Sequence, residues 1–369
     1  MLIRPKLSLL ALPALLALGA GAAQAATPGT TPTLAWRGDL ATSRALMQDL
    51  GKAWTRQSKV PIHLQPFSTI SGIDAVAAGR VDFGGSARPA FVHRQRETGL
   101  DFVPVAWDAV VLITHHGNPV KHVSLRQLND IYYGRIINWK ALGGPNRPIH
   151  LYAVAGPLDG IEYSLRQYLF GRGNQPVAAP RLYINTRQLE AAVAIDPLAL
   201  GASTLSSVAG NRKLDMLAVE HVQPSRAHLG DGSYPLSIPL YLVVAAGSPR
   251  HAEVEQFIDF LHGRKAAHIM RANHLLPYRA DGALALGHHE HLLAVQEQAH
   301  HPMNGPVAAP GATYAAAAAV APTSQRTVVA RRRLQQAQRR RAPGKLQPAP
   351  ATSAVAPAPA GTSPAQPAH

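Results

Sequence analysis

Hydrophobic and polar positions in the middle of the chain follow two patterns that alternate. Apolar runs typical of buried strands occupy residues 103–114, 150–154 and 240–246. Apolar residues at helical spacing mark one face of residues 43–57 and of residues 254–264. Strand-like segments that alternate with helical segments are typical of α/β proteins, so the pattern predicts an α/β fold for this part of the chain.

The beginning of the chain has the pattern of a secretory signal peptide, expected to cover residues 1–25. Arg4 and Lys6 precede an apolar run, and small residues follow it up to the expected cleavage site before Ala26. The apolar run is too short to predict a membrane span. The sequence contains no cysteine, so it has neither a disulfide framework nor a site for lipid attachment. We therefore expect a protein secreted to the periplasm that is not a lipoprotein.

The end of the chain, residues 302–369, is rich in alanine and proline and poor in large apolar residues. This composition predicts a disordered tail, because it cannot bury enough surface to offset the entropy lost on ordering. The tail carries eight basic residues and no acidic one, about half of the net charge of +15. In an exported chain such a tail is expected to contact anionic envelope surfaces or to have no specific partner, and nucleic acid is not expected.

Three segments carry a pattern more specific than composition. They are residues 70–89 (ISGIDAVAAGRVDFGGSARP), 125–144 (LRQLNDIYYGRIINWKALGG) and 234–244 (YPLSIPLYLVV). Together and in this order, they resemble the periplasmic phosphate-binding proteins that supply ABC importers. The resemblance covers residues 32 to about 285.

The resemblance implies a two-lobed, type II periplasmic binding protein-like fold. Each lobe would be a mixed sheet flanked by helices, and two segments near residues 106–111 and 235–241 would cross between the lobes. The ligand of such proteins binds in the interlobe cleft, which closes by a hinge motion. The expected boundaries are residues 26–107 and 240–285 for lobe 1, 108–239 for lobe 2, and 286–301 for a histidine-rich helical linker.

The resemblance also implies a set of anion-binding residues in lobe 1. In the family, hydroxyl groups, N–H groups at helix N-termini, one arginine and one aspartate hold the anion. Asp82 matches that aspartate, which accepts a hydrogen bond from the protonated oxygen of phosphate; its alternative role is a turn carboxylate paired with Arg88. The implied ligand-binding residues are Thr69, Ser71, Gly72, Asp82, Ser86, Arg88 and Arg37.

The first loop of the resemblance is altered. Arg37, Gly38 and Asp39 stand where the family has glycine followed by serine or threonine. Thr42 or Ser43 is expected to cap the helix that follows. An aspartate here does not favour an anion, and Arg37 is the candidate to compensate.

The lobe 2 loop departs further from the family pattern of arginine, three residues, then Ser-Gly-Thr. Ala153 stands at the arginine, Pro157 at the serine and Asp159 at the threonine. Three side-chain donors are lost, and each hydrogen bond to a charged partner contributes ~1.5–3 kcal/mol, so anion binding is expected to be weak. Asp159, with Glu162 three residues later, predicts an N-cap. Asp159 faces either the cleft, where it would repel an anion, or solvent in a tight turn.

The function implied by the resemblance is binding of phosphate or a related small ligand in the interlobe cleft and delivery to an ABC permease, without catalysis. The sequence has no nucleophile elbow, P-loop or zinc-protease motif, and no cofactor is expected. Six histidines between His274 and His301 define no metal geometry, so no metal site is assigned. The alternative is a ligand-free periplasmic binding protein-like module that acts as an interaction or scaffold protein of the cell envelope through its basic tail.

Overall fold

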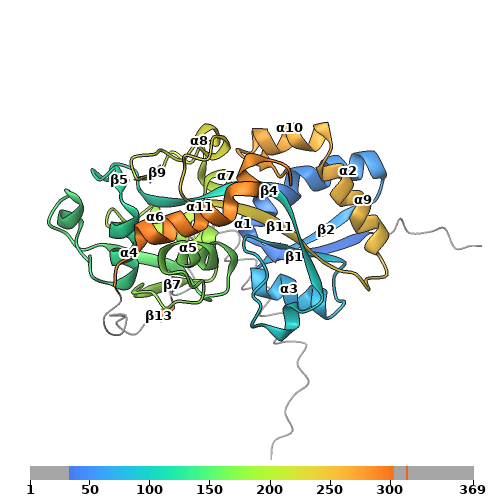
Figure 1. The fold of residues 1–369 in the computed structure, drawn as a ribbon, viewed down its shortest axis with the longest axis horizontal. Helices are drawn as coiled ribbons and strands as arrows, with labels where there is room; N and C mark the ends of the chain where they lie inside the picture. Colours follow the sequence, from blue (N-terminus) through green and yellow to red (C-terminus); the bar gives the residue numbers. More distant parts are fainter. Residues whose placement is uncertain (1–32, 303–312, 315–369) are drawn as a thin grey trace, which may run out of the picture. The chain divides into compact units, whose positions relative to one another are not determined.

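The computed structural model describes residues 33–302 and 313–314. The expected signal peptide lies outside the described residues, as does the expected basic tail except for residues 302 and 313–314. The described residues form a mixed sheet of eleven strands, with helices packed against it (Figure 1). This architecture confirms the predicted α/β fold.

Strand β4 (Leu100–His115) connects the two halves of the sheet. Its residues 100–109 pair antiparallel with β11 (Ser237–Ala245), and its residues 110–114 pair antiparallel with β8 (Ala199–Thr204). We use lobe 1 for the half built on β11 and lobe 2 for the half built on β8, while the residue boundaries expected from the sequence stay a prediction. One continuous strand therefore belongs to both lobes.

The strand order is β13-β7-β6-β8-β4-β11-β3-β1-β2, and β9 and β12 also pair with β4. Lobe 1 contains three parallel strands, β1 (Leu34–Asp39), β2 (Ile62–Phe67) and β3 (Phe83–Ser86). The remaining strands are β5 (His122–Val123), β6 (His150–Val154), β7 (Arg181–Tyr183), β9 (Leu214–Met216), β10 (Ala218–Val219), β12 (Leu276–Pro277) and β13 (Thr313–Tyr314).

The helices of lobe 1 include one irregular segment. The helix expected over residues 43–57 is divided into α1 (Leu40–Thr42), a π-helical stretch (Ser43–Met47) and α2 (Gln48–Ser58). The other lobe 1 helices are α3 (Thr69–Ala77), a 3₁₀ turn (Gln95–Glu97), α9 (His251–Leu261) and α10 (Arg264–Ala272).

Lobe 2 has its own set of helices. They are α4 (Leu125–Tyr133), a 3₁₀ turn (Trp139–Leu142), α5 (Gly160–Phe170), α6 (Thr186–Val193) and α7 (Leu205–Val208), and α8 (Arg226–Gly230) follows near the crossing. Two helices, one in each lobe, begin with a side-chain capping box. Ser68 and Ser71 form a capping box at α3, and Ser124 and Gln127 form one at α4.

The core is continuous from one lobe to the other. In lobe 1, the ring of Phe257 lies 5.7 Å from that of Trp54 and 5.6 Å from that of Phe83. Between the lobes, residues 105–107 and 109–113 of β4 are almost fully buried. The shared strand is therefore covered on both faces, as is typical of strands at the centre of α/β sheets.

Helix α11 (Ala283–Ala299) also connects the two lobes. It follows β12, which pairs with β4, and packs on α4 and α5 of lobe 2 (Figure 1). His291 Nε2 lies 2.8 Å from the carbonyl oxygen of Pro235, and Gln296 Nε2 donates to the carbonyl oxygen of Gln167 at 2.9 Å. The ring of His288 packs edge-on against Trp107. His288 and His291 of this helix thus make packing and backbone contacts.

Two further properties concern the described residues. No group of three or more His, Cys, Asp or Glu side chains among them could hold a metal ion. None of their helices is both long and apolar enough to cross a membrane.

Replacing Gly72 by alanine tests how closely α3 packs on β1. A Cβ at Gly72 would lie 2.5 Å from the carbonyl oxygen of Arg37, so the helix has to move away from the strand. We expect Gly72→Ala to lower the free energy of unfolding by about 1–3 kcal/mol, measured by urea denaturation.

Gly51→Ala in α2 is the matched control. Its Cβ would meet nothing closer than Ile62 Cδ1 at 3.9 Å, so the better helix propensity of alanine should raise stability by up to about 1 kcal/mol. Equal effects of the two substitutions would contradict the packing argument.

Candidate ligand site between the lobes

The lobes meet where two helices from different lobes begin close together. Thr69 is the first residue of α3 in lobe 1, and Gly160 is the first residue of α5 in lobe 2. Asp39, the last residue of β1, lies at the same junction. Helix N-termini carry unpaired N–H groups and a partial positive charge, so their convergence favours a negatively charged group.

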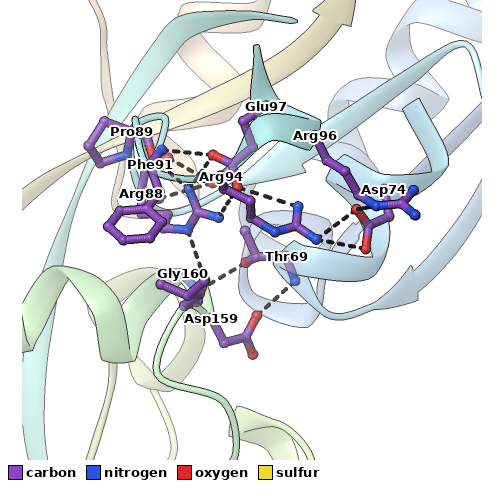
Figure 2. A network of polar contacts seen from close by, with 12 residues as sticks. Thr69, Asp74, Arg88, Pro89, Phe91, Arg94, Arg96, Glu97, Asp159 and Gly160 are labelled. Carbon is purple, nitrogen blue, oxygen red and sulfur yellow. Dashed lines mark hydrogen bonds and ion pairs between the residues drawn. The ribbon is translucent and has the colours of Figure 1, made fainter. Parts of the chain in front are cut away.

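Thr69 is the centre of the hydrogen bonds at the junction and is fully buried. Its backbone N–H donates to Asp159 Oδ1 at 2.8 Å, and its hydroxyl accepts from the N–H of Gly160 at 3.0 Å (Figure 2). The same hydroxyl donates to Asp39 Oδ2 at 3.0 Å. The polar groups of Thr69 are therefore bound by protein groups, two of which come from the other lobe.

Gly160 permits this close approach of the lobes because it lacks a side chain. A Cβ at this position would lie 2.9 Å from both Ala87 Cβ and Thr69 Oγ1. Such distances are shorter than carbon atoms tolerate, so any larger residue would push the lobes apart.

Asp39 is held by its own segment. Its carboxylate accepts from the backbone N–H of Thr42 at 2.7 Å and from the hydroxyl of Thr42 at 2.9 and 2.8 Å. Asp39 is therefore the N-cap of α1, and the expectation that Thr42 or Ser43 would cap this helix is corrected. Burial raises the pKa of Asp39, and the hydrogen bonds from Thr42 and Thr69 oppose that shift.

Asp159 faces the cleft, and its side chain is 9% exposed. It stands at the N-cap position of α5 but makes no capping bond to that helix; instead it binds the first N–H of α3. Glu162, expected to complete the cap, accepts from the N–H of Val154 at 2.9 Å. The prediction that Asp159 caps α5 is therefore wrong. The lobes approach closely enough for its carboxylate to cap α3 of the facing lobe instead.

Burial and, to a smaller extent, the nearby charge of Asp39 raise the pKa of Asp159 to about 6, against the hydrogen bond from the N–H of Thr69. Two carboxylates thus share the junction and share Thr69 as a donor. Such a pair is electrostatically unfavourable when both groups are ionised.

Little free volume remains at this junction. The cavity lined by Asp39, Leu40, Phe67, Val154 and Asp159, among others, has a volume of about 10 Å³. A single water molecule needs roughly 10–15 Å³ measured in this way. A phosphate ion therefore does not fit unless the lobes move.

Arg88 lies beside the junction but is fully buried, and Glu97 neutralises its charge. Its two terminal nitrogens donate to Glu97 at 2.9 and 2.6 Å, and its Nε donates to the carbonyl oxygen of Leu158 at 2.8 Å (Figure 2). Ser86 Oγ supports the same loop by donating to the carbonyl oxygen of Arg88 at 2.7 Å. Arg88 thus joins lobe 1 to the lobe 2 loop.

Other expected ligand residues lie around α3. Ser71 Oγ belongs to the capping box and also accepts from Arg37 Nε at 3.2 Å. The Arg37 guanidinium lies 5.6 Å from the ring centre of Phe67. Gly72 is in contact with β1, as described above. These three residues border the junction on the lobe 1 side.

Asp82 lies elsewhere. It precedes β3, and its Oδ2 accepts from the N–H of Ala35 at 2.7 Å, near the beginning of β1. Asp39 ends the same strand four residues later, about 13 Å away at the rise of a β-strand. The structure therefore does not bring Asp82 to the junction. The alternative role, in which Asp82 would pair with Arg88, is also not found, because Arg88 pairs with Glu97.

Of the three altered residues of the lobe 2 loop, Ala153, Pro157 and Asp159, only Asp159 reaches the junction. Ala153 is buried within β6, and Pro157 is exposed. Sequence reasoning missed Glu97 and Gly160, since nothing local links Glu97 to Arg88 nine residues before it. For Asp39 a signal existed, because an aspartate three residues before a buried threonine at a helix start is a common N-cap pattern.

Further hydrogen bonds hold the lobes together. Arg44 of lobe 1 binds Glu190 on α6 through two bonds of 2.9 and 3.0 Å. Ser164 Oγ on α5 donates to the carbonyl oxygen of Ala87 at 2.8 Å. These contacts, like those at the junction, bind one lobe directly to the other.

Comparison with known proteins identifies the class of this bilobal protein. A family model described as a PBP (periplasmic binding protein) superfamily domain matches residues 23–265 of the 369 residues. The chain therefore belongs to this family, and the resemblance noted in the sequence is confirmed.

Two curated relatives are more specific. The protein is 25% identical over 237 residues to Protein SphX of Synechococcus elongatus, which covers 59% of this chain and 68% of that protein. It is 27% identical over 181 residues to the Phosphate-binding protein PstS of Bacillus subtilis, which covers 47% of this chain and 57% of that protein. The chain thus spans about two thirds of the first relative and little more than half of the second.

Solved structures share the fold. A putative phosphate ABC transporter substrate-binding protein with bound phosphate from Clostridium perfringens matches with a TM-score of 0.61 and 24% identity, over 67% of this chain and 100% of that chain. An ABC-type phosphate transport receptor from Vibrio cholerae matches with a TM-score of 0.53 and 22% identity, over 66% and 99%. At these identities, the likeness establishes the architecture.

The raised pKa of Asp159 predicts that stability falls as pH rises. A carboxyl group with a folded-state pKa near 6 and an unfolded value near 3.9 binds its proton more tightly when folded. Its stabilising contribution is present below about pH 4 and is lost as pH rises through 6, up to about 3 kcal/mol in total. We expect Asp159→Asn to flatten the decline in free energy of unfolding between pH 4.5 and 7, measured by urea denaturation.

Asp215→Asn is the control for this series. Burial acts to raise the pKa of Asp215, but hydrogen bonds from Lys121 and His116 outweigh it and the pKa is lowered. Its contribution therefore changes below pH 4, outside the measured window. Parallel pH profiles for wild type and Asp159→Asn would contradict the assignment.

The Arg88–Glu97 pair is expected to be essential for stability. Glu97→Gln leaves the buried guanidinium without a countercharge, so the free energy of unfolding should fall by ~3–5 kcal/mol. Asp281→Asn breaks the exposed pair with Arg279 and should leave the free energy of unfolding close to that of wild type, because solvent screens an exposed ion pair. Both variants are measured by guanidinium chloride denaturation. An equal change in the free energy of unfolding for Glu97→Gln and Asp281→Asn would argue against a structural role for the buried pair.

Proposed function

We propose that the protein is an extracytoplasmic solute-binding protein that takes up phosphate or a related small oxyanion between its lobes and delivers it to an ABC permease. The observation that carries this proposal is the convergence of the α3 and α5 N-termini, from opposite lobes, on a point where a carboxylate already accepts from a backbone N–H. An environment that holds one anion in this way has the donors to hold another.

Once the lobes separate, this junction offers donors suited to an oxyanion. The N–H groups of Thr69 and Gly160 now bind protein partners across the cleft, and opening releases them together. Opening also removes the N–H of Gly160 from the Thr69 hydroxyl, which stays bonded to Asp39 within lobe 1. Ser71 and Arg37 border the same helix end. Binding would involve hydrogen bonds and lobe closure and no bond breaking, so no enzymatic activity is proposed.

The relatives support the ligand class and the partner. One curated relative is named a phosphate-binding protein, and one structural relative was solved with phosphate bound. Export through the expected signal peptide would bring the protein to the periplasm, where a permease would receive the ligand. Contact of the basic tail with anionic envelope surfaces remains part of the proposal that rests on sequence alone.

A second function is favoured by the filled junction. The cavity of about 10 Å³ and the interlobe bonds of Arg44 and Arg88 describe a form closed by the protein's own groups. Such a form suits a ligand-free interaction or scaffold protein of the envelope. Direct binding measurements separate this function from solute transport.

Isothermal titration calorimetry of the purified protein with phosphate, sulfate and molybdate tests the proposal. We expect saturable but weak phosphate binding, with a Kd of roughly 0.1–1 mM, because few side-chain donors face the cleft. Thr69→Val removes the central hydroxyl and should weaken phosphate binding about tenfold, the usual effect of one lost hydrogen bond to a charged group. Thr55→Val on α2 is the matched control and should bind as wild type. The absence of heat with all three anions would exclude oxyanion binding and favour the scaffold function.

A further inference from the structure

We propose that Asp159 is a tethered internal anion of the cleft: its carboxylate occupies the ligand's place at the start of α3 and holds the two lobes together there. The identity of the competing ligand, phosphate, rests on the function proposed above. Solute then binds by displacing Asp159 from Thr69.

The position of Asp159 is that of a ligand and differs from that of a capping residue. Its Oδ1 accepts from the N–H of Thr69, ninety residues away in the chain, at 2.8 Å, and it makes no capping bond to α5. Another N–H group of the first turn of α3 is satisfied within its own segment, since Ser68 Oγ accepts from the N–H of Ser71. Asp159 therefore takes up the donor at the helix start that faces the opposite lobe.

Asp159 is also the more easily displaced of the two carboxylates at the junction. Asp39 is bound by the N–H and hydroxyl of Thr42, within its own turn, so it stays in place when the lobes part. The described bond of Asp159 crosses the cleft, so it is broken by the same motion that opens the site. Figure 2 shows Asp159 reaching from the lobe 2 loop to Thr69.

Two of the arginines near the junction already pair with carboxylates of their own and do not offset the added charge. Arg88 is paired with Glu97, and Arg44 is paired with Glu190. Arg37 contacts Ser71 and lies over Phe67. A phosphate entering while Asp159 remains would meet two carboxylates, so the departure of Asp159 relieves repulsion as well as releasing donors.

The test combines phosphate titration with a measurement of lobe separation. The chain has no cysteine, so Gln57→Cys in lobe 1 and Lys140→Cys in lobe 2, both exposed, provide unique spin-label sites. Their distance distribution is measured by pulsed electron paramagnetic resonance, with and without inorganic phosphate. Each measurement is made on the wild type, Asp159→Ala, Asp159→Asn and the control Asp101→Ala, an exposed residue of β4 outside the junction.

We expect Asp159→Ala to bind phosphate at least about tenfold more tightly than wild type, the effect of about 1.4 kcal/mol. Without phosphate its lobes should sample longer distances, and phosphate should restore the short distance. Asp159→Asn, which keeps the shape but loses the charge, should fall between the two. Asp101→Ala should behave as wild type in both measurements, and circular dichroism verifies that each variant is folded.

The outcomes separate this inference from the proposed function. Phosphate binding of equal strength in wild type and Asp159→Ala, with unchanged distances, would overturn the internal anion and leave the proposed function intact. Open lobes in Asp159→Ala without phosphate binding in any variant would support Asp159 as the closing group and overturn the phosphate function. Closed lobes without binding in every variant would overturn both.

Discussion

The hydrogen bond between the Thr69 N–H and the Asp159 carboxylate joins the beginning of α3 in lobe 1 to the residue before α5 in lobe 2. Around it, a helix end of lobe 1, a glycine of lobe 2 and the last residue of β1 are close enough to exclude solvent. The close contact at Gly160 and the small cavity follow from this approach. The same interaction explains why the junction has a negatively charged group and a helix dipole in a favourable arrangement without any bound solute.

Buried charge in this protein is treated in two different ways. Arg88 and Glu97 are both enclosed and neutralise each other through two short hydrogen bonds, an arrangement that is costly to break. Asp39 and Asp159 are enclosed as like charges and depend on N–H and hydroxyl donors. The Arg88–Glu97 pair holds the loop between β3 and β4 in place. The Asp39–Asp159 pair makes the junction sensitive to any other anion that can accept a hydrogen bond from Thr69.

Much of the fold could be predicted from the sequence because the relevant signals are local. The apolar runs at 103–114, 150–154 and 240–246 correspond to β4, β6 and β11, and the ordered segments pointed to the correct family. The helix over 43–57 was predicted without its π-helical stretch, since no residue pattern there marks the change in hydrogen bonding.

The site was harder to predict, because its partners are set by how the lobes meet. The departure of the lobe 2 loop was visible in the sequence, and so was the option that Asp159 faces the cleft. Its partner Thr69 lies ninety residues away, and only the closed arrangement brings them together. Arg88 and Asp82 show the same limit: each was noted from its flanking residues, yet their partners, Glu97 and Ala35, follow from loop and strand geometry.

The attachment of Asp159 to a short loop has a kinetic and thermodynamic consequence. A group on a short tether competes with free solute as if present at an effective concentration in the millimolar range or above. Micromolar solute would rarely displace it, whereas millimolar solute would do so often. A binding protein built in this way responds to abundance and ignores traces, so it would report when solute is plentiful instead of collecting it when it is scarce.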